Sequence, residues 1–383
     1  MSTAANRSSG ASPSHPRPAH PVLCWAARII GIGAAVWVAL RFLPAPLDHV
    51  GPIPALVSAT PWLIIPLALA LALAAVGRAR IIAALMVACL MLQACWQLPF
   101  YLDTSRRLSD EALEASGTYE PEATAGKTAA AGEPGTADAP GVADTAAAAN
   151  AAGTAAPSAV RAMTLNTYFG QADVDQLCAI VAEQDVDVLA LEEVTPELTA
   201  RLQASELPNL LPHRIGEERG QQIWSRLPLE DEAANETGFE VSPACAASVR
   251  LAGRERLRFV AIHTTAPVGR RGAQWAASIA LVGQLGQQPY RQGDARYVLM
   301  GDFNATMDHR VFREMLGERF VDAAQASGAG LDFTWPSNHP GIPQLIAIDH
   351  MVLDQGVRAA DMQTITVAGS DHQALLFTLG VEP

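Results

Sequence analysis

Hydrophobic and polar residues are distributed very unevenly along this chain of 383 residues. Three nearly continuous apolar segments come first, at Val22–Leu43, Leu56–Val76 and Ile81–Tyr101. Each is close to the roughly 20 residues that a membrane-spanning helix needs. A cleaved signal peptide would explain neither the second and third segments nor the polar residues 1–20 before the first. The pattern therefore predicts a region of three transmembrane helices at residues 21–101.

The positions of basic residues predict how these helices are oriented. The leader, residues 1–20, carries two arginines, and the second connection, Gly77–Arg80, carries two more. The first connection, residues 44–55, has no Lys or Arg. By the positive-inside rule, the leader and the second connection are expected in the cytoplasm. Three spans then put the rest of the chain outside the cytoplasm, as part of a multi-pass protein of the cell membrane, although Arg106 and Arg107 oppose this orientation.

The two remaining parts of the chain differ sharply in composition. Residues 102–158 are rich in Ala, Gly, Thr and Pro and contain few large apolar side chains. Such a segment does not bury enough surface to offset the entropy of ordering it, so we expect a flexible linker. Residues 159–383 look globular and are long enough for a substantial core. Strand patterns outnumber helical ones there, which indicates two packed sheets with helices outside them.

The periodicity also predicts individual elements in the globular part. We expect strands at Val160–Asn166, Val186–Leu191, Gln221–Ser225, Ala246–Leu251, Leu257–His263, Tyr297–Met300, Leu345–Leu353 and Gln373–Leu379. We expect helices at Asp173–Gln184, Pro196–Ala204 and Gly272–Leu285.

The stretch Tyr297–Asn304 is the centre of the candidate chemistry. Its apolar run ends at Gly301, after which Asp302 and Asn304 stand two residues apart. Residues i and i+2 of a strand point to the same face, and ligands bind at the carboxyl ends of strands in layered α/β folds. A carboxylate beside a carboxamide can take a proton from water while an oxyanion is held. A turn is nevertheless the simpler explanation of this stretch taken alone.

Further polar residues stand where other predicted strands begin or end, except for Asp349, which lies inside the predicted strand Leu345–Leu353. They are Asn166, Glu193, His263, Asp349, Asp371 and His372. Each has an ordinary explanation when taken singly, such as a turn, a helix cap or a core histidine. A carboxylate in an apolar strand is costly, however, unless it is paired or bound to a metal. Their recurrence within one domain therefore indicates a functional site.

These residues give the chain a specific resemblance. It resembles the endonuclease/exonuclease/phosphatase superfamily of metal-dependent phosphoesterases over about residues 160–380. The resemblance rests on Leu165-Asn166, Leu189–Val194, Trp224–Arg226, Ala261–His263, Gly301–Asn304, Ile348–His350 and Gly369–His372. Together with the apolar segments, His263–Pro267 and Thr334–Pro336 make the chain look most like the membrane-anchored branch associated with teicoplanin resistance.

The resemblance implies a four-layer α/β/β/α sandwich that binds Mg²⁺ or Mn²⁺. It implies that Glu193 is the principal metal ligand, with Asn166 beside it and Asp371 supporting the metal side. Oxygen ligands of this kind suit such hard cations. Asp302 would then orient or deprotonate the attacking water, and Asn304 would hold a phosphoryl oxygen.

The resemblance also assigns roles to three residues on the phosphate side. His372 would contact the phosphate, Asp349 would fix the ring of His372, and His263 would make a further phosphate contact. One departure concerns the metal. Many nucleases of the superfamily have an acidic residue two positions after the asparagine that Asn166 matches, whereas this chain has Tyr168. The number of metal ions therefore stays open.

Charge and cysteine content narrow the function further. Residues 158–383 contain 29 Asp and Glu against 17 Arg and no Lys, a net charge of −12. Proteins that bind nucleic acid usually present a basic surface, so this balance disfavours a nucleic acid substrate. The globular part has two of the five cysteines, Cys178 and Cys245, and whether they form a disulfide is left open.

Three functions remain to be weighed. The leading hypothesis is a membrane-anchored phosphoesterase that hydrolyses a phosphate ester or pyrophosphate outside the cytoplasm, and a lipid-linked pyrophosphate of cell-wall synthesis is the natural candidate. The alternative is an extracytoplasmic endonuclease or exonuclease. A third hypothesis, a binding or sensor module with a decayed site, is opposed by the intact Glu193, Asp302, Asn304 and His372.

Overall fold

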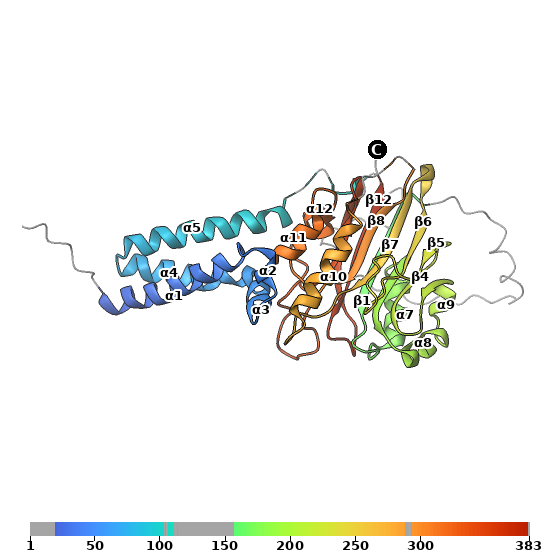
Figure 1. Cartoon of the computed structure of the whole chain (residues 1–383), viewed down its shortest axis with the longest axis horizontal. Helices are drawn as coiled ribbons and strands as arrows, with labels where there is room; N and C mark the ends of the chain where they lie inside the picture. Colours follow the sequence, from blue (N-terminus) through green and yellow to red (C-terminus); the bar gives the residue numbers. More distant parts are fainter. Residues whose placement is uncertain are drawn as a thin grey trace, which may run out of the picture. The chain divides into compact units, whose positions relative to one another are not determined.

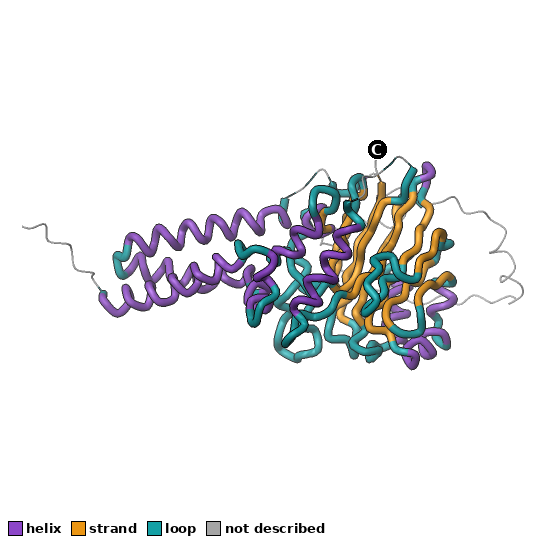
Figure 2. Tube along the Cα trace, viewed as in Figure 1, coloured by secondary structure: helices purple, strands orange, loops and turns teal. Residues whose placement is uncertain are grey.

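The computed structural model describes residues 20–102, 104, 106–110, 113, 157–287, 291 and 293–381. The chain divides into two compact units (Figures 1 and 2). The first, here called the helical unit, comprises Met1–Phe42 and Ala59–Gln97. The second, here called the sandwich unit, comprises Leu43–Ser58 and Leu98–Pro383. The residues that connect the first two apolar segments therefore fold with the C-terminal part of the chain.

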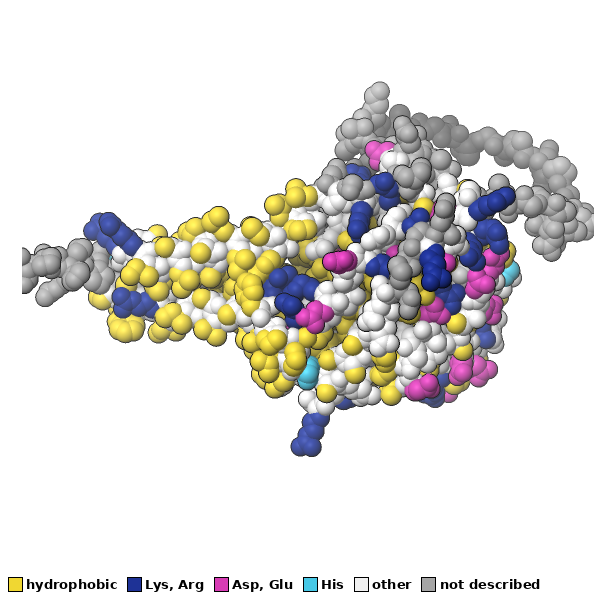
Figure 3. Space-filling view, turned by 45° about the horizontal axis from the view of Figure 1, so that its top comes forward, with side chains coloured by type: hydrophobic (Ala, Val, Ile, Leu, Met, Phe, Trp, Pro, Cys, Tyr) yellow, Lys and Arg dark blue, Asp and Glu magenta, His cyan; other side chains and the backbone are white. Residues whose placement is uncertain are grey.

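The helical unit contains α1 (Pro21–Leu40), η1 (Thr60–Leu63), α4 (Ile64–Val76) and α5 (Arg80–Gln97). Its helices pack on one another through small and apolar side chains, which include Ala34, Val38, Leu63, Leu67, Ala70, Met86 and Cys89. Hydrophobic side chains also cover the outside of these helices (Figure 3). A helix that is apolar on all sides is typical of a membrane span rather than of a protein surface in water.

Two of the three predicted spans are long and apolar enough to cross a bilayer. Among the described residues these are Pro21–Leu40, with 20 residues, and Arg80–Phe100, with 21. The apolar helix Thr60–Val76 is shorter than 18 residues. The start of the predicted middle span, Leu56, belongs instead to α3 (Ile53–Ser58) of the sandwich unit. A third span therefore stays a prediction.

The sandwich unit contains two mixed six-stranded sheets within the part of the chain that the structure describes. The first sheet has the order β11 (Val357–Thr366), β12 (Gln373–Val381), β1 (Ala159–Asn166), β2 (Val188–Val194), β4 (Gly220–Ser225) and β3 (His213–Gly216). The second has the order β5 (Glu230–Ala233), β6 (Ala246–Arg250), β7 (Arg256–His263), β8 (Arg296–Asp302), β10 (Asp349–Leu353) and β9 (Val321–Asp322). In each sheet one pair is parallel, β1 with β2 and β7 with β8.

Alternating side chains build three cores. The inner faces of both sheets meet in one core, to which β1 contributes Val160 and Ala162. The outer residues of β1, Met163 and Leu165, pack under the helices α7 (Val174–Glu183) and α8 (Pro196–Gln203). The helices α10 (Gly272–Gln284) and α11 (Arg310–Leu316) cover the outer face of the second sheet. The predicted α/β sandwich, with packed sheets and outer helices, is confirmed.

Most predicted elements of the sandwich unit are present, with ends that differ by a few residues. The predicted strand Leu345–Leu353 begins only at Asp349, and Ile346 instead forms an isolated bridge with Trp335. The pattern did not predict β3, β5, β9, β11, α2 (Ala45–Asp48), α3, η2 (Leu98–Phe100), α9 (Leu207–Leu210), η3 (Ala252–Arg254), α11 or α12 (Ala323–Ser327). Most of these are too short to show a period.

The predicted linker is described only at its two ends. Arg107 pairs with Ala359 of β11, and Leu108 and Leu113 are buried against Ala159 and Ala360. At this end the chain is therefore attached to the edge of the first sheet, which the composition of residues 102–158 did not indicate. Residues 114–156 lie outside the described residues.

The two cysteines of the globular part are free thiols in different cores. The Cys178 Sγ lies 3.4 Å from the hydroxyl of Ser205, and the Cys245 Sγ lies 3.5 Å from the Gln221 carbonyl oxygen. The pairing that the sequence left open is thus absent from the structure.

We expect Gly301→Ala to destabilise the sandwich unit. Gly301 has a φ of 140°, and a Cβ there would lie 2.0 Å from the Ile262 carbonyl oxygen in the neighbouring β7. The backbone strain and the clash together should lower the free energy of unfolding by more than ~2 kcal/mol. Thermal unfolding of the full chain in detergent would measure this loss.

Gly341→Ala is the matched control for this substitution. Gly341 also has a positive φ, 82°, but a Cβ there would meet no described atom within 4 Å. This variant should therefore show only the strain, a loss of ~1 kcal/mol. Equal losses for the two variants would show that the contact with Ile262 is not a constraint.

Candidate active site

The site forms where the inner faces of the two sheets reach the strand ends. Asn166, His263 and Asp302 each continue the inward-facing set of residues of β1, β7 and β8. In the parallel pair of β7 and β8, His263 is the register partner of Asp302. In the antiparallel pair of β8 and β10, Asp349 is the register partner of Asp302. The predicted strand-end residues are therefore brought together by register, because the inner face changes from apolar to polar at the same edge.

Glu193 reaches the same point by a break in the alternation of β2. Glu192 follows Val188 and Ala190 into the core, so Glu193 should face the outer helices. Glu193 has a φ of 55°, and this left-handed backbone turns the strand so that the Glu193 side chain lines the cavity instead. The Phe169 N–H donates to Glu193 Oε2 at 2.9 Å, and Phe169 itself has a φ of 52°. Strained backbone is concentrated here, as is common at functional sites.

Asp302 accepts hydrogen bonds from both asparagines of the site. Its Oδ2 accepts from Asn166 Nδ2 at 3.0 Å and from Asn304 Nδ2 at 3.1 Å, and its Oδ1 accepts from the Asn304 N–H at 2.7 Å. Burial raises the pKa of Asp302 to about 6, with the Asp349 carboxylate adding to the rise and His372 opposing it. A carboxylate with this pKa can accept a proton near neutral pH.

Asn304 orients Asp302. One amide hydrogen of Asn304 is directed at the Thr264 carbonyl oxygen, 3.0 Å from Nδ2, and the other at Asp302. Its φ of 49° is a left-handed value that asparagine adopts more readily than most residues. Because both amide hydrogens are used, the expected contact between Asn304 and a phosphoryl oxygen stays a prediction.

His372 and Asp349 form a buried pair beside Asp302. His372 Nδ1 donates to Asp349 Oδ2 at 2.8 Å, and the Thr334 hydroxyl donates to the same oxygen at 2.5 Å. Burial alone would lower the pKa of His372, but the carboxylates of Asp349, Asp302 and Asp371 outweigh it and raise this pKa to about 10. His372 is therefore an imidazolium at neutral pH. Its Nε2 lies 3.9 Å from Asp302 Oδ2, too far for a hydrogen bond.

His263 and Asp371 complete the wall of the site. His263 Nε2 lies 3.4 Å from Glu193 Oε1 and 3.8 Å from Asp302 Oδ2. Asp371 Oδ2 accepts from the indole N–H of Trp335 at 3.4 Å. Burial raises the pKa of Asp371, and the Glu193 carboxylate acts in the same direction. Two carboxylates that repel each other thus face one cavity.

A comparison with family models agrees with this geometry. The model of the Endonuclease/Exonuclease/phosphatase family matches residues 163–372, more than half of the chain. The chain belongs to this family. Its members are metal-dependent phosphoesterases and nucleases. A comparison with curated proteins gave no match.

Several solved structures resemble this chain in fold. A humanized D. rerio TDP2 is 17% identical, with a TM-score of 0.49 and coverage of 58% of this chain and 99% of that one. A mannosyl-6-phosphatase from Bacteroides thetaiotaomicron is 15% identical, with a TM-score of 0.45 and coverage of 57% and 99%. An endonuclease/exonuclease/phosphatase from Beutenbergia cavernae is 16% identical, with a TM-score of 0.47 and coverage of 58% and 72%. Likenesses this weak say nothing about the substrate of this chain.

The donor atoms of the site fit the divalent cation that this family uses. Glu193, Asp302 and Asp371 bring carboxylate oxygens to one cavity, and oxygen donors suit Mg²⁺ and Mn²⁺. Asn166 directs its Nδ2 at Glu193 Oε1, 3.3 Å away, and at Asp302. An amide turned by half a rotation would direct its oxygen there instead. His372 suits a cation poorly, because an imidazolium has no lone pair to offer.

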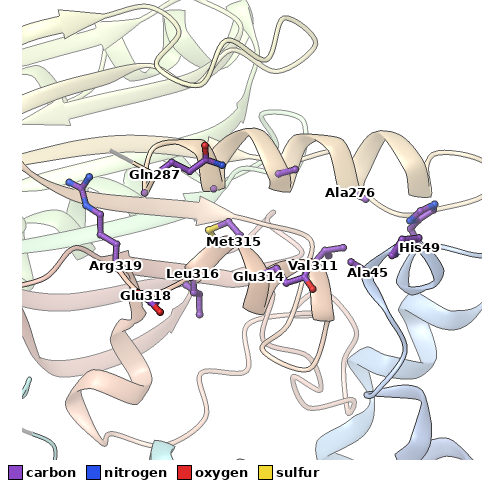
Figure 4. A pocket seen from close by; sticks show the side chains of 15 residues that line it. Ala45, His49, Ala276, Gln287, Val311, Glu314, Met315, Leu316, Glu318 and Arg319 are labelled. Atoms are coloured by element: carbon purple, nitrogen blue, oxygen red, sulfur yellow. The ribbon is translucent and has the colours of Figure 1, made fainter. Parts of the chain in front are cut away.

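The cavity over these residues has a volume of about 320 Å³. Glu193, His263, Asp302, Asn304, Asp371 and His372 all line it. A larger cavity of about 700 Å³ lies between α2, α10 and α11 (Figure 4). None of the candidate catalytic residues lines this second cavity, and its walls are mainly Ala, Gly and other uncharged side chains. The smaller cavity is therefore the candidate active site.

A second buried cluster of titratable residues lies behind the site. His350 Nδ1 donates to Asp322 Oδ2 at 2.8 Å and Nε2 donates to the Ala305 carbonyl oxygen at 2.8 Å. Burial would lower the pKa of His350, but the carboxylates of Asp322 and Asp332 raise it to about 9. Since both ring nitrogens donate, His350 is a charged structural link between β10 and Asp322 of β9, the residue that caps α12.

The structure brings the predicted residues together and adds several supporting residues that the sequence did not indicate. Thr334 and Trp335 hold Asp349 and Asp371, but no pattern marked them for these roles. Glu192 is fully buried beside the site, and its Oε1 accepts from the Thr164 hydroxyl at 2.8 Å. Burial raises the pKa of Glu192 well above its ordinary value. Its inward direction could have been derived from the alternation of β2.

We expect Asp349→Asn to make activity fall at alkaline pH. The neutral amide removes the nearest carboxylate that keeps His372 charged, so the pKa of His372 should drop from about 10. If His372 binds a phosphate oxygen, as the sequence predicts, and does so as an imidazolium, the alkaline limb of kcat/KM should move to lower pH by more than about 1 unit. The pH profile of phosphate release would measure the shift.

Thr334→Val is the control for this prediction. It removes the hydroxyl that donates to Asp349 but leaves the charge in place. Its alkaline limb should stay close to that of the unaltered protein. An unchanged profile for Asp349→Asn would contradict the assigned pairing of Asp349 with His372.

Proposed function

We propose that this chain is a membrane-anchored, metal-dependent phosphoesterase that hydrolyses a phosphate ester or pyrophosphate outside the cytoplasm. The observation that supports the reaction type is the convergence of Asp302, His372 and Glu193 on one cavity. Displacement at a phosphoryl group is helped by a base for the attacking water, here Asp302, and by a positive charge beside the phosphate, here His372. It is also helped by a carboxylate that can hold a metal ion, here Glu193.

Each residue of the site would have a separate role in hydrolysis. Asp302, oriented by Asn304 and Asn166, accepts the proton of the attacking water. His372, held charged by Asp349, binds a phosphoryl oxygen whose negative charge grows in the transition state. His263 supplies a second contact from β7. A divalent cation held by Glu193, Asn166 and Asp371 would neutralise further charge on the phosphate.

A lipid-linked pyrophosphate is the substrate that we favour. The candidate spans α1 and α5 would bring the site to a membrane that holds such a substrate. The sequence resemblance to the teicoplanin-resistance branch supports the same substrate class. The net charge of −12 over residues 158–383 makes a nucleic acid backbone a poor match.

The test is phosphate release by the full chain in detergent with Mg²⁺ or Mn²⁺. Farnesyl pyrophosphate and plasmid DNA would be offered in parallel. Asp302→Ala should lower kcat by at least about 100-fold, because it removes the base that accepts a proton. EDTA should abolish release, and added metal should restore it.

Two results would contradict the proposal. Cleavage of DNA without release from the pyrophosphate would indicate a nuclease. Equal activity of the unaltered protein and Asp302→Ala would show that the observed release does not come from this site.

The proposed location makes a separate prediction. A phosphatase reporter that is active only outside the cytoplasm, fused after residue 381, should be active in whole cells. The same reporter fused within Gly77–Arg80 should be inactive, because the two arginines there favour the cytoplasm. The opposite pattern would require a different number of spans or the reverse orientation.

A further inference from the structure

The segment Leu43–Ser58 belongs to the sandwich unit, although it connects α1 and α4 of the helical unit along the chain. It contains the short helices α2 and α3. We call it the connecting loop. Its position matters because one of its ends lines the candidate active site.

Two buried hydrogen bonds hold the connecting loop on the sandwich unit. Asp48 is 1% exposed, and its Oδ2 accepts from the Val311 N–H of α11 at 3.1 Å. His309 is fully buried, and its Nδ1 accepts from the Thr306 N–H at 2.9 Å. The other nitrogen, Nε2, therefore carries the hydrogen and donates to the Pro54 carbonyl oxygen at 3.0 Å. Burial lowers the pKa of His309, in agreement with a neutral ring.

A glycine of the sandwich unit also fits the connecting loop closely. A Cβ at Gly272, the first residue of α10, would lie 2.1 Å from the His49 carbonyl oxygen. Any other residue would push the loop backbone away, since such a contact is far inside van der Waals distance. The sequence of α10 is thus compatible with this docking only because it has glycine there.

The docked loop forms an uncharged, mainly apolar wall of the cavity, because the Ser58 hydroxyl donates to the Pro54 carbonyl oxygen of the loop itself. Pro54, Ala55 and Ser58 line the cavity that also contains Asp302 and His372. Ala55 is exposed and directed at this space. The cavity is therefore charged where the strands end and largely apolar where the loop covers it.

Two large apolar side chains extend this wall at the rim of the cavity. Phe169 is 67% exposed and Val268 is 64% exposed, and both line the same cavity. Exposed apolar side chains that gather beside a polar site are typical of a surface that binds an apolar group. The charged residues of the cavity, such as Asp302 and His372, bind an apolar group poorly. Phe169 and Val268 would therefore contact a different part of the substrate from the phosphate.

We propose that Pro54, Ala55 and Ser58, with Phe169 and Val268, form a subsite for the hydrocarbon chain of the substrate. This subsite rests on the proposed function and assigns the substrate class as a phosphate or pyrophosphate of a long-chain alcohol. The phosphate lies over Asp302 and His372, and the first carbons of the chain lie against the connecting loop. Each methylene buried there should improve binding by about fourfold.

The course of the chain favours a membrane lipid over a soluble apolar group. Only Ala59 separates Ser58 from the apolar helix that begins at Thr60, and two residues span at most ~7 Å. At its other end, the loop begins three residues after α1, which is long and apolar enough to cross a bilayer. The apolar wall is therefore covalently joined on both sides to segments that suit a lipid environment.

The test measures binding of two non-hydrolysable probes, butylphosphonate and decylphosphonate, to the full chain in lipid nanodiscs. Isothermal titration, with empty nanodiscs subtracted, should show at least about tenfold tighter binding of the decyl probe. Ala55→Gln should remove most of this difference by placing a longer polar group on the wall, while butylphosphonate binding stays within about twofold.

Val50→Gln is the matched control, because Val50 lies in the same loop, is 47% exposed and does not line the cavity. It should preserve the preference for the decyl probe. Loss of the preference in both variants, or in neither, would overturn the subsite. Thermal unfolding of each variant would show whether the loop remains folded.

Turnover of farnesyl and isopentenyl pyrophosphate by the same proteins separates the two proposals. A chain-length preference in binding without any turnover would contradict the proposed function and leave the subsite supported. Turnover of both substrates with equal kcat/KM, and no effect of Ala55→Gln, would contradict the subsite and leave the phosphoesterase supported.

Discussion

The crowding of carboxylates at one edge of the sandwich is the constraint on which the site depends. Asp302 and Asp349 are register partners at the ends of buried strands, so neither can move away from the other. Repulsion between buried charges is strong, because water does not screen it. The structure offsets it with the imidazolium of His372 on one side and the amides of Asn166 and Asn304 on the other. The same negative charge would attract a cation, and it adds to burial in raising the pKa of Asp302.

Strand ends are the part of this site that a sequence predicts well. Apolar runs fix the strands, and the residue that follows each run, such as Asn166 or Asp302, must lie at the edge of a sheet. The resemblance of the motifs then supplied the arrangement of the sheets, which periodicity alone does not determine. Roles that depend on a single contact, such as that of Thr334 on Asp349, had no pattern that could reveal them.

Two features of the structure could not be predicted from the sequence, each for a physical reason. The position of Glu193 results from a left-handed φ, whereas strict alternation would direct its side chain toward the helices. The connecting loop was hidden because its apolar residues extend the adjoining apolar segments, so hydropathy merges α3 with the predicted span that follows it. The contacts of Asp48, His309 and Gly272 show that it belongs to the sandwich unit.

The order of strands in the first sheet has a consequence for biosynthesis. β12, the last strand along the described chain, lies between β11 and β1 and pairs with both. The sheet therefore cannot be completed until β12 is synthesised, and the edge of β1 that faces away from β2 stays unpaired until more than 200 later residues have followed it. The connecting loop, synthesised among the first 60 residues, likewise has no surface on which to dock until α10 and α11 follow it more than 200 residues later. A chain interrupted before β12 would therefore expose the backbone edge of β1, which is a template for pairing with other chains.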